Sequence, residues 1–265
     1  MVSPHAHISP NAELGKNVQI DPFVVIHDDV VIGDGSHIMS NAVIMSGTRI
    51  GKSCLVFPGA VIGAIPQDLK FIGENTTVEI GDNTTIRECV TINRGTKDKW
   101  KTVIGSNCLL MAYAHVAHDC VLGDHVILAN GVQLAGHVEV GDHAIIGGLA
   151  GAPQFSRIGA HTYVAGHTVV TKDVPPFIKA GRNPISFAGV NSVGLQRRGF
   201  SNDTINAILE VYRTIYNKGL NTTQALEYVN VQLPPCKEKD QIVSFIKDSK
   251  RGVIKLFNKA DIDED

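Results

Sequence analysis

Two histidines and an aspartate within five positions, His115, His118 and Asp119, form the part of this chain best suited to chemistry. A third imidazole, His137, follows nineteen residues after His118. A neutral imidazole has an unperturbed pKa of about 6.5 and can act as a general base near neutral pH. Imidazoles gathered from adjacent segments can instead bind Zn²⁺. Catalysis by a base, a metal site and a purely structural or binding role are therefore the three interpretations.

The elements that must position these side chains follow from a period of six residues. Every sixth residue from Ile8 to Val170 gives 28 positions, of which 24 are Ile, Leu or Val. Six is not a helical period, and residues two apart in a strand face the same side. Glycines spaced 18 apart, as at Gly105 and Gly123, indicate three short strands per coil. The pattern predicts a parallel β-helix, a three-sided prism of stacked coils. His115, His118 and His137 are expected to line one edge of it.

Composition limits the remaining possibilities. Five cysteines, an odd number without paired spacing, favour reduced thiols in a cytoplasm. Cys54, Cys108 and Cys120 occupy inward positions of the repeat and are predicted to be core residues. The first ten residues contain no basic or apolar segment, so no signal peptide is expected. A net charge of −2 argues against a nucleic-acid binder, and no apolar run is long enough to predict a membrane span.

Polar residues interrupt the repeat in two places. Asp68 breaks the pattern within residues 64–77, and Asp98 breaks it within residues 94–101. These two segments are predicted to be excursions from the prism, and the first carries Gln67, Asp68 and Lys70 outside it. Loops that project from a rigid scaffold often carry function.

Three regions are predicted along the chain. Residues 1–176 form the hexapeptide-repeat β-helix, which ends at consecutive prolines. Residues 177–200 form an irregular connector that ends in QRRGF. Residues 201–265 form a small α-helical domain, with Ser201 as a helix N-cap, Gly219 as a stop, and further helices at about 222–232 and 237–249. The last eight residues, NKADIDED, are interpreted as a loose acidic tail.

Several motifs resemble those of a known enzyme family. They are PQDLKF at 66–71, IRECVTINRGT at 86–96, LLMAYAHVAHDC at 109–120, LAGHVEVGD at 134–142, IIGG at 145–148 and GLQRRGF at 194–200. With the repeat, they are similar to the bacterial UDP-N-acetylglucosamine O-acyltransferases, which open lipid A biosynthesis. The resemblance runs nearly end to end. It implies a left-handed β-helix and a homotrimer with its sites between neighbouring prisms.

The resemblance also implies a reaction. A (3R)-hydroxyacyl chain moves from acyl carrier protein to the glucosamine 3-hydroxyl of UDP-N-acetylglucosamine, with His118 as the general base. The backbone N–H of Gly136 is then the donor to the oxyanion. No acyl-enzyme, metal or cofactor is expected, because the donor is a thioester on the phosphopantetheine of acyl carrier protein. A zinc-dependent β-helical hydratase, similar to carbonic anhydrase, remains the alternative.

Further positions are predicted to contact the substrates. They are Gln67, Asp68, Lys70, His115, Asp119, His137, Gln154, Asn191, Arg197 and Arg198. Arg197 and Arg198 suit a diphosphate, because guanidinium groups make bidentate, charge-assisted hydrogen bonds. Gly166 matches the position that sets acyl length, and glycine there implies a long chain.

Acyl carrier protein, an acidic partner, is expected to dock on four cationic side chains. These are Arg157, Lys172, Lys179 and Arg182. The chain also departs from the family at three positions. Asn93 and Pro153 stand where family members often have His, and Val193 stands where they have Glu. Contacts to the nucleotide and the donor are expected to differ around them.

Overall fold

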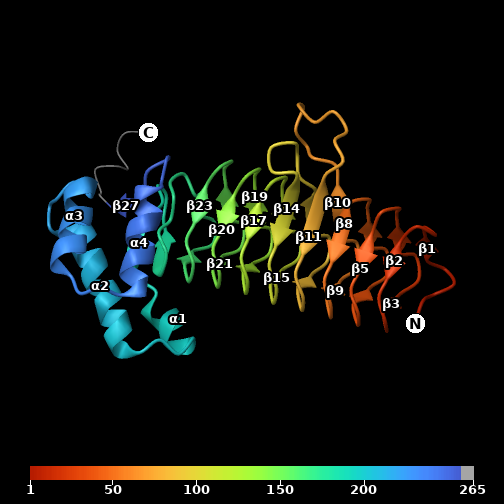
Figure 1. The fold of residues 1–265 in the computed structure, drawn as a ribbon, viewed down its shortest axis with the longest axis horizontal. Coiled ribbons are helices and arrows are strands. Elements are labelled where there is room, and N and C mark those ends of the chain that lie inside the picture. Colours follow the sequence, from red (N-terminus) through yellow and green to blue (C-terminus); the bar gives the residue numbers. More distant parts are fainter. Residues whose placement is uncertain (258–265) are drawn as a thin grey trace.

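The computed structural model describes residues 1–257 and consists of a three-sided parallel β-helix followed by a small helical domain (Figure 1). The acidic tail predicted at residues 258–265 lies outside the described residues. Most strands of the prism contain only two residues, the first facing outward and the second inward. Each strand pairs with the strand one coil away, as His115 pairs with Gln133 and Val116 with Leu134.

Three sheets, which we call A, B and C, form the sides of the prism. Sheet B comprises β1 (His7–Ile8), β4 (Val25–Ile26), β7 (Val43–Ile44), β10 (Val61–Ala64), β13 (Thr91–Asn93), β16 (His115–Val116), β19 (Gln133–Leu134) and β22 (Gly151–Ala152). Sheet C comprises β2 (Glu13–Leu14), β5 (Val31–Ile32), β8 (Thr48–Ile50), β11 (Thr77–Ile80), β14 (Lys101–Ile104), β17 (Val121–Leu122), β20 (Glu139–Val140) and β23 (Arg157–Ile158). Sheet A comprises β3 (Gln19–Ile20), β6 (His37–Ile38), β9 (Leu55–Val56), β12 (Thr85–Ile86), β15 (Leu109–Leu110), β18 (Ile127–Leu128), β21 (Ile145–Ile146), β24 (Tyr163–Val164), β25 (Ile178–Gly181), β26 (Ser186–Val190) and β27 (Lys255–Leu256).

The core of the prism is the set of aliphatic residues that the six-residue period predicts. Cys54, Cys108 and Cys120 are also buried, which confirms their assignment to the core. Burial raises the pKa of the Cys108 thiol to about 11 and that of Cys120 to about 12. Such thiols stay protonated at neutral pH, so these cysteines are inert packing residues.

Both predicted excursions leave the prism at the same edge, where sheet B turns into sheet C (Figure 1). The first connects β10 to β11, and the second connects β13 to β14. The turn from β16 to β17, which contains His118 and Asp119, lies on this B–C edge as well. The excursions therefore rise beside the residues with catalytic potential.

The prediction of an irregular connector at 177–200 is wrong. β25 continues sheet A in parallel with β24, β26 returns antiparallel to β25, and α1 (Ser192–Arg197) follows. Pro175 and Pro176 end the six-residue pattern, but they lie in a turn, and the strand resumes after it. Sheet A consequently extends beyond the boundary predicted at residue 176.

The predicted helices are confirmed. They are α2 (Asn202–Asn217), α3 (Thr222–Gln232) and α4 (Lys237–Lys247). Ser201 caps α2 by accepting a hydrogen bond from the Thr204 N–H at 3.1 Å. The buried Tyr212 of α2 donates its hydroxyl to the carbonyl of Pro176, which fixes the helical domain to the last coil. Within residues 1–257, no helix has the length and apolarity needed to cross a membrane.

Candidate active site

The centre of the site is a hydrogen-bonded pair on the B–C edge. Nδ1 of His118 lies 2.9 Å from Oδ2 of Asp119, and both side chains are buried. Asp119 is at a corner with φ of 59°, a conformation that Asp adopts more readily than most residues. An ionised carboxylate only accepts hydrogen bonds, so Nδ1 of His118 is the donor and Nε2 carries the lone pair. A neutral imidazole held in this tautomer can act as a general base.

The carboxylate of Asp119 is held by the second excursion. The Thr96 hydroxyl donates to Oδ2 at 2.6 Å, and the Thr96 N–H donates to Oδ1 at 2.9 Å. Burial by itself would raise the pKa of Asp119, but the hydrogen bonds from Thr96 and His118 outweigh it and hold this pKa below its usual range. The Asp119 N–H donates to the Thr102 hydroxyl. Asp119 therefore remains ionised and oriented towards His118.

Gly136, on the next coil, lies against the open end of the His118 ring. A Cβ atom at Gly136 would be 2.6 Å from Nε2 and 2.5 Å from Cε1 of His118, so only glycine fits without displacement. The N–H of Gly136 donates to no acceptor in the part of the chain that the structure describes. A backbone donor beside the basic nitrogen is the geometry that an oxyanion requires.

His115 and His118 face one pocket of about 410 Å³. Its walls also include Gln67, Gln133, Gly136, Pro153, Gln154 and Val169. Nδ1 of His115 is 2.7 Å from the Thr91 hydroxyl, and burial together with the charge of His118 lowers the pKa of His115. A neutral His115 can make a hydrogen bond to a molecule bound in this pocket. The excursion residue Gln67 lines the same pocket.

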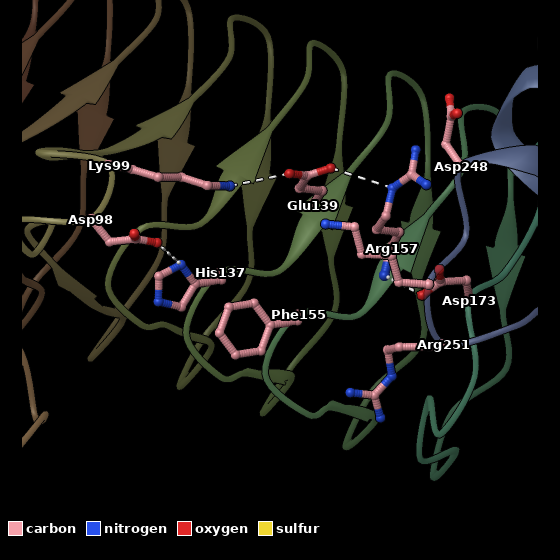
Figure 2. Close-up of a pocket in the computed structure, with 10 residues that line it drawn as sticks. Asp98, Lys99, His137, Glu139, Phe155, Arg157, Asp173, Asp248 and Arg251 are labelled. Carbon is pink, nitrogen blue, oxygen red and sulfur yellow. Dashed lines mark hydrogen bonds and ion pairs between the residues drawn. The ribbon is translucent and has the colours of Figure 1, made fainter.

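His137 lies on the other side of the edge. Its ring packs edge-on against that of His118, with centroids 5.1 Å apart, and stacks on Phe155 at 4.5 Å. Figure 2 shows His137 and Phe155 in a second pocket of about 440 Å³, with Asp98 beside His137. Burial, more than any neighbouring charge, lowers the pKa of His137. The three histidines share one edge, but only two of them face the same pocket.

His118, Asp119 and His137 are also close enough to hold a metal ion, with one ligand atom of each within 4.8 Å of the others. The hydrogen bonds that Asp119 already accepts oppose the binding of a metal ion by these three residues. Oδ2 of Asp119 accepts from Thr96 and from His118, so a cation at this oxygen would have to displace one of these donors. The residues fit a hydrogen-bonded base better than a zinc centre.

Asp68 and Lys70 of the first excursion are half-buried and exposed, respectively. Oδ1 of Asp68 accepts from the N–H of Lys70 at 2.9 Å, which shapes the loop, and the Lys70 side chain is exposed. Asn93 is buried and donates to the carbonyl of Ile65 at 3.1 Å. Asn93 therefore fixes the base of this loop. Pro153 lines the pocket but has no polar side chain to offer a ligand. Val193 is 60% exposed and is likewise apolar.

The predicted diphosphate-binding residues lie on a different edge, where sheet C turns into sheet A. Arg198 donates to the carbonyl of His143 at 2.9 Å, and Asn191 donates to the carbonyl of His161 at 3.0 Å. Arg197 is exposed beside them. Gly166 lies on the third edge, between β24 and the following turn. One chain therefore does not bring all the predicted site residues together.

The four cations predicted to dock acyl carrier protein do not form one patch. Arg157 projects from sheet C, whereas Lys179 projects from sheet A, because each is the outward residue of its strand pair. The ammonium of Lys172 instead donates to the Arg251 carbonyl at 3.4 Å, and Arg251 lines the second pocket with Arg157. Arg157 and Lys179 therefore lie on different faces of one chain, and docking of acyl carrier protein on the four cations stays a prediction.

Two features of the site were not predicted from sequence. Thr96 and Thr102 hold Asp119, and no local pattern marks them. On the C–A edge, the imidazoles of His125, His143 and His161 stack at centroid distances of 4.5 and 4.8 Å. Their spacing of 18 residues, one coil, was the signal that could have revealed this stack.

Family models match two parts of the chain. The model described as "Udp N-acetylglucosamine O-acyltransferase; Domain 2" matches residues 173–254. The model described as "Bacterial transferase hexapeptide (six repeats)" matches residues 11–45, 29–64 and 101–136. The second domain thus contributes its own signature in addition to the repeat.

Curated relatives and solved structures are similar over most of the chain. The acyl-[acyl-carrier-protein]–UDP-N-acetylglucosamine O-acyltransferase of Thermodesulfovibrio yellowstonii is 46% identical, over 83% of this chain and 85% of its own length. That of an Anaeromyxobacter strain is 44% identical, over 78% of this chain and 80% of its own length.

Among solved structures, the UDP-N-acetylglucosamine acyltransferase from Bacteroides fragilis has a TM-score of 0.95 at 51% identity, covering 96% of this chain and 100% of its own. The Francisella novicida enzyme has a TM-score of 0.95 at 37% identity, covering 100% of this chain and 97% of its own. These similarities confirm the predicted fold class, a left-handed parallel β-helix with a small C-terminal helical domain.

Proposed function

Because the chain belongs to the UDP-N-acetylglucosamine O-acyltransferase family, we propose that it transfers a (3R)-hydroxyacyl chain from acyl carrier protein to the glucosamine 3-hydroxyl of UDP-N-acetylglucosamine, the first step of lipid A biosynthesis. The observation that carries the mechanism is the position of Nε2 of His118. This nitrogen lies beside Gly136 at the wall of a pocket, and Nδ1 is occupied by Asp119.

In this mechanism, Nε2 of His118 removes the proton of the sugar hydroxyl as its oxygen attacks the thioester carbonyl. The oxygen of that carbonyl becomes negative, and the N–H of Gly136 donates to it. The C–S bond then breaks, and the imidazolium of His118 returns its proton to the leaving thiolate. Asp119 stabilises the imidazolium while it exists. The steps balance without an acyl-enzyme, a metal or a bound cofactor.

The outward residues of the sheets support a trimer. Those of sheet A include Leu55, Leu109, Ile127 and Ile145, and those of sheet B include Val25, Val43 and Val61. Those of sheet C include Glu13, Arg49, Glu79, Glu139 and Arg157. Charged outward residues concentrate on sheet C, which fits a trimer in which sheets A and B pack against neighbours while sheet C meets water.

A trimer of this kind also completes the site. If sheet B of one chain packs on sheet A of the next, the B–C edge of the first meets the C–A edge of the second. Asn191, Arg197 and Arg198 of the neighbour would then lie across the pocket from His118, where paired guanidinium groups can bind the diphosphate. The cleft between two prisms would exclude water better than one open face.

The phosphopantetheine of acyl carrier protein carries the donor, so the acidic carrier must dock within reach of His118. Arg157, Lys250 and Arg251 line the second pocket with four carboxylates, and the Lys172 ammonium donates to the carbonyl of Arg251. We propose these four cations as the docking residues, in place of the set expected from sequence. The five free cysteines suit a reducing cytoplasm, which we propose as the compartment.

The test is acyl transfer from a panel of acyl carrier protein thioesters to UDP-N-acetylglucosamine, comparing the intact protein with His118→Ala. We expect transfer by the intact protein and a loss of about 10²-fold to 10⁴-fold in the variant. Full activity of the variant would refute the mechanism. Stoichiometric zinc with CO₂ hydration, and no acyl transfer, would favour the hydratase instead.

A further inference from the structure

The second excursion, residues 94–101, is the source of the donors that hold Asp119. Thr96, which is 7% exposed, provides two of them, its hydroxyl to Oδ2 at 2.6 Å and its N–H to Oδ1 at 2.9 Å. The N–H of Lys99 reaches Oδ1 at 3.3 Å. Thr96 itself lines neither pocket beside the pair. It therefore acts on His118 only through Asp119.

The excursion is itself held firmly against the prism. The N–H of Gly95 donates to the carbonyl of Thr77 at 3.0 Å, and the N–H of Trp100 donates to the carbonyl of Thr96 at 2.8 Å. Figure 2 shows the ammonium of Lys99 reaching Glu139 of β20, at 3.1 Å. The position of the Thr96 hydroxyl is consequently set by contacts on both sides of the loop.

Asp119 has a competing partner. Nε2 of His137 lies 3.7 Å from the same Oδ2 that faces His118. A small rotation of the carboxylate would exchange one imidazole for the other. The Thr96 hydroxyl donates to Oδ2 and its N–H to Oδ1, so the two hydrogen bonds together fix the plane of the carboxylate.

We propose that Thr96 is a positioning residue, which holds the carboxylate of Asp119 on Nδ1 of His118 and away from His137. This inference rests on the acyl transfer proposed above. With Asp119 fixed, the proton of His118 stays on Nδ1 and Nε2 stays free to accept the proton of the sugar hydroxyl. Without it, Asp119 divides its contacts between two imidazoles, and His118 spends part of its time in the wrong tautomer.

Two matched pairs of proteins test the role of the hydroxyl. The intact protein and Thr96→Val have side chains of the same shape, and Thr96→Ser and Thr96→Ala both lack the methyl group. In each pair we expect kcat of the member without the hydroxyl to be lower by about tenfold or more. The KM for UDP-N-acetylglucosamine should differ by no more than about twofold within the pair. The Ser and Ala pair decides the matter if Thr96→Val does not fold.

Equal kcat within each pair would overturn the inference. So would a loss of kcat in Thr96→Ser as large as that in Thr96→Ala, because the hydroxyl would then be irrelevant.

A second measurement does not depend on activity. Nitrogen-15 NMR of the histidine side chains reports which nitrogen of His118 carries the proton. We expect Nδ1 in the intact protein and in Thr96→Ser, and a mixture of tautomers in Thr96→Ala. An unchanged tautomer in Thr96→Ala would overturn the inference even if acyl transfer occurs. If the expected tautomers are observed in a protein that transfers no acyl group, the positioning role of Thr96 is supported. Only the proposed function is then refuted.

Discussion

His118 and Asp119 are consecutive in the chain, yet Nδ1 of the first lies 2.9 Å from Oδ2 of the second. Neighbours in a strand face opposite sides, so this contact requires the corner. The φ of 59° at Asp119 turns its side chain back towards the preceding imidazole. The proposed base and the carboxylate that orients it therefore lie in one turn of the repeat.

The first prediction concerns this pair. Asp119→Asn should lower kcat by about 10²-fold or more, because an amide does not fix the proton on Nδ1 of His118. KM should change little. Steady-state kinetics check this, with Asp124→Asn as the matched control. Asp124 is an exposed corner aspartate on the C–A edge that accepts from the Ser106 N–H, and its variant should keep full kcat. Equal losses in the two variants would contradict the prediction.

Gly136 should tolerate no side chain. In Gly136→Ala, the added Cβ would lie 2.5 Å from Cε1 and 2.6 Å from Nε2 of the present His118 ring, so either the ring or the turn must move. We expect kcat to fall by about tenfold or more, since misplacement of a base by a fraction of an ångström is costly. The melting temperature should remain close to that of the intact protein. Unaltered kcat would show that the N–H of Gly136 is not at the reacting centre.

Gly166 should influence the length of the acyl chain. A Cβ there would lie 2.9 Å from the carbonyl oxygen of Gly148, so any side chain at position 166 requires a small shift of the backbone at this edge. We expect Gly166→Met to prefer shorter acyl thioesters than the intact protein does. Competition between thioesters of different lengths measures this preference. The same preferred length in both proteins would place the end of the acyl groove elsewhere.

The trimer can be tested with a matched pair on two faces. Ile127 and Val121 are both outward residues of the prism, on sheet A and sheet C respectively. Ile127→Asp should lower the mass measured by light scattering from three times 28.4 kDa towards the single chain, and should abolish transfer. Val121→Asp should leave both unchanged, because sheet C faces water in the proposed trimer. A trimer that survives in Ile127→Asp would exclude sheet A from the interface.

The imidazole stack makes the fold sensitive to acid. Burial, reinforced by the charges of His143 and Arg198, lowers the pKa of His161 to about 4. The unfolded chain takes up this proton near pH 6.5, whereas the folded chain does so only near pH 4. The stability contributed by a neutral His161 is therefore complete above about pH 6.5 and is lost as the pH falls towards 4.

The substitution His161→Phe should remove this loss of folding stability at low pH. Nδ1 of His161 has no hydrogen-bond partner in residues 1–257, and the ring stacks on Phe177, so His161→Phe sacrifices no polar contact of that atom. We expect the drop in melting temperature between pH 7 and pH 5 to be smaller in the variant. An identical drop in both proteins would show that other groups cause the acid sensitivity.

The sequence by itself determined the prism, its inward residues, the two excursions and the capped helices. It could do so because a six-residue period and a helix cap are local signals, repeated or reinforced within a few residues. The motif around His118 also indicated the family, because it occurs in this chain together with PQDLKF and QRRGF. The error at residues 177–200 arose because prolines mark the end of a strand but not the pairing that resumes after a turn.

Only the tertiary structure decided how the site is assembled. The contact of Thr96 with Asp119 spans 23 residues and depends on the path of an excursion that no period describes. The separation of Arg198 from His118 onto different edges follows from the winding of the coils and the return of the chain after β26. Side-chain contacts between distant segments depend on how the backbone packs in three dimensions, and local sequence does not encode that packing.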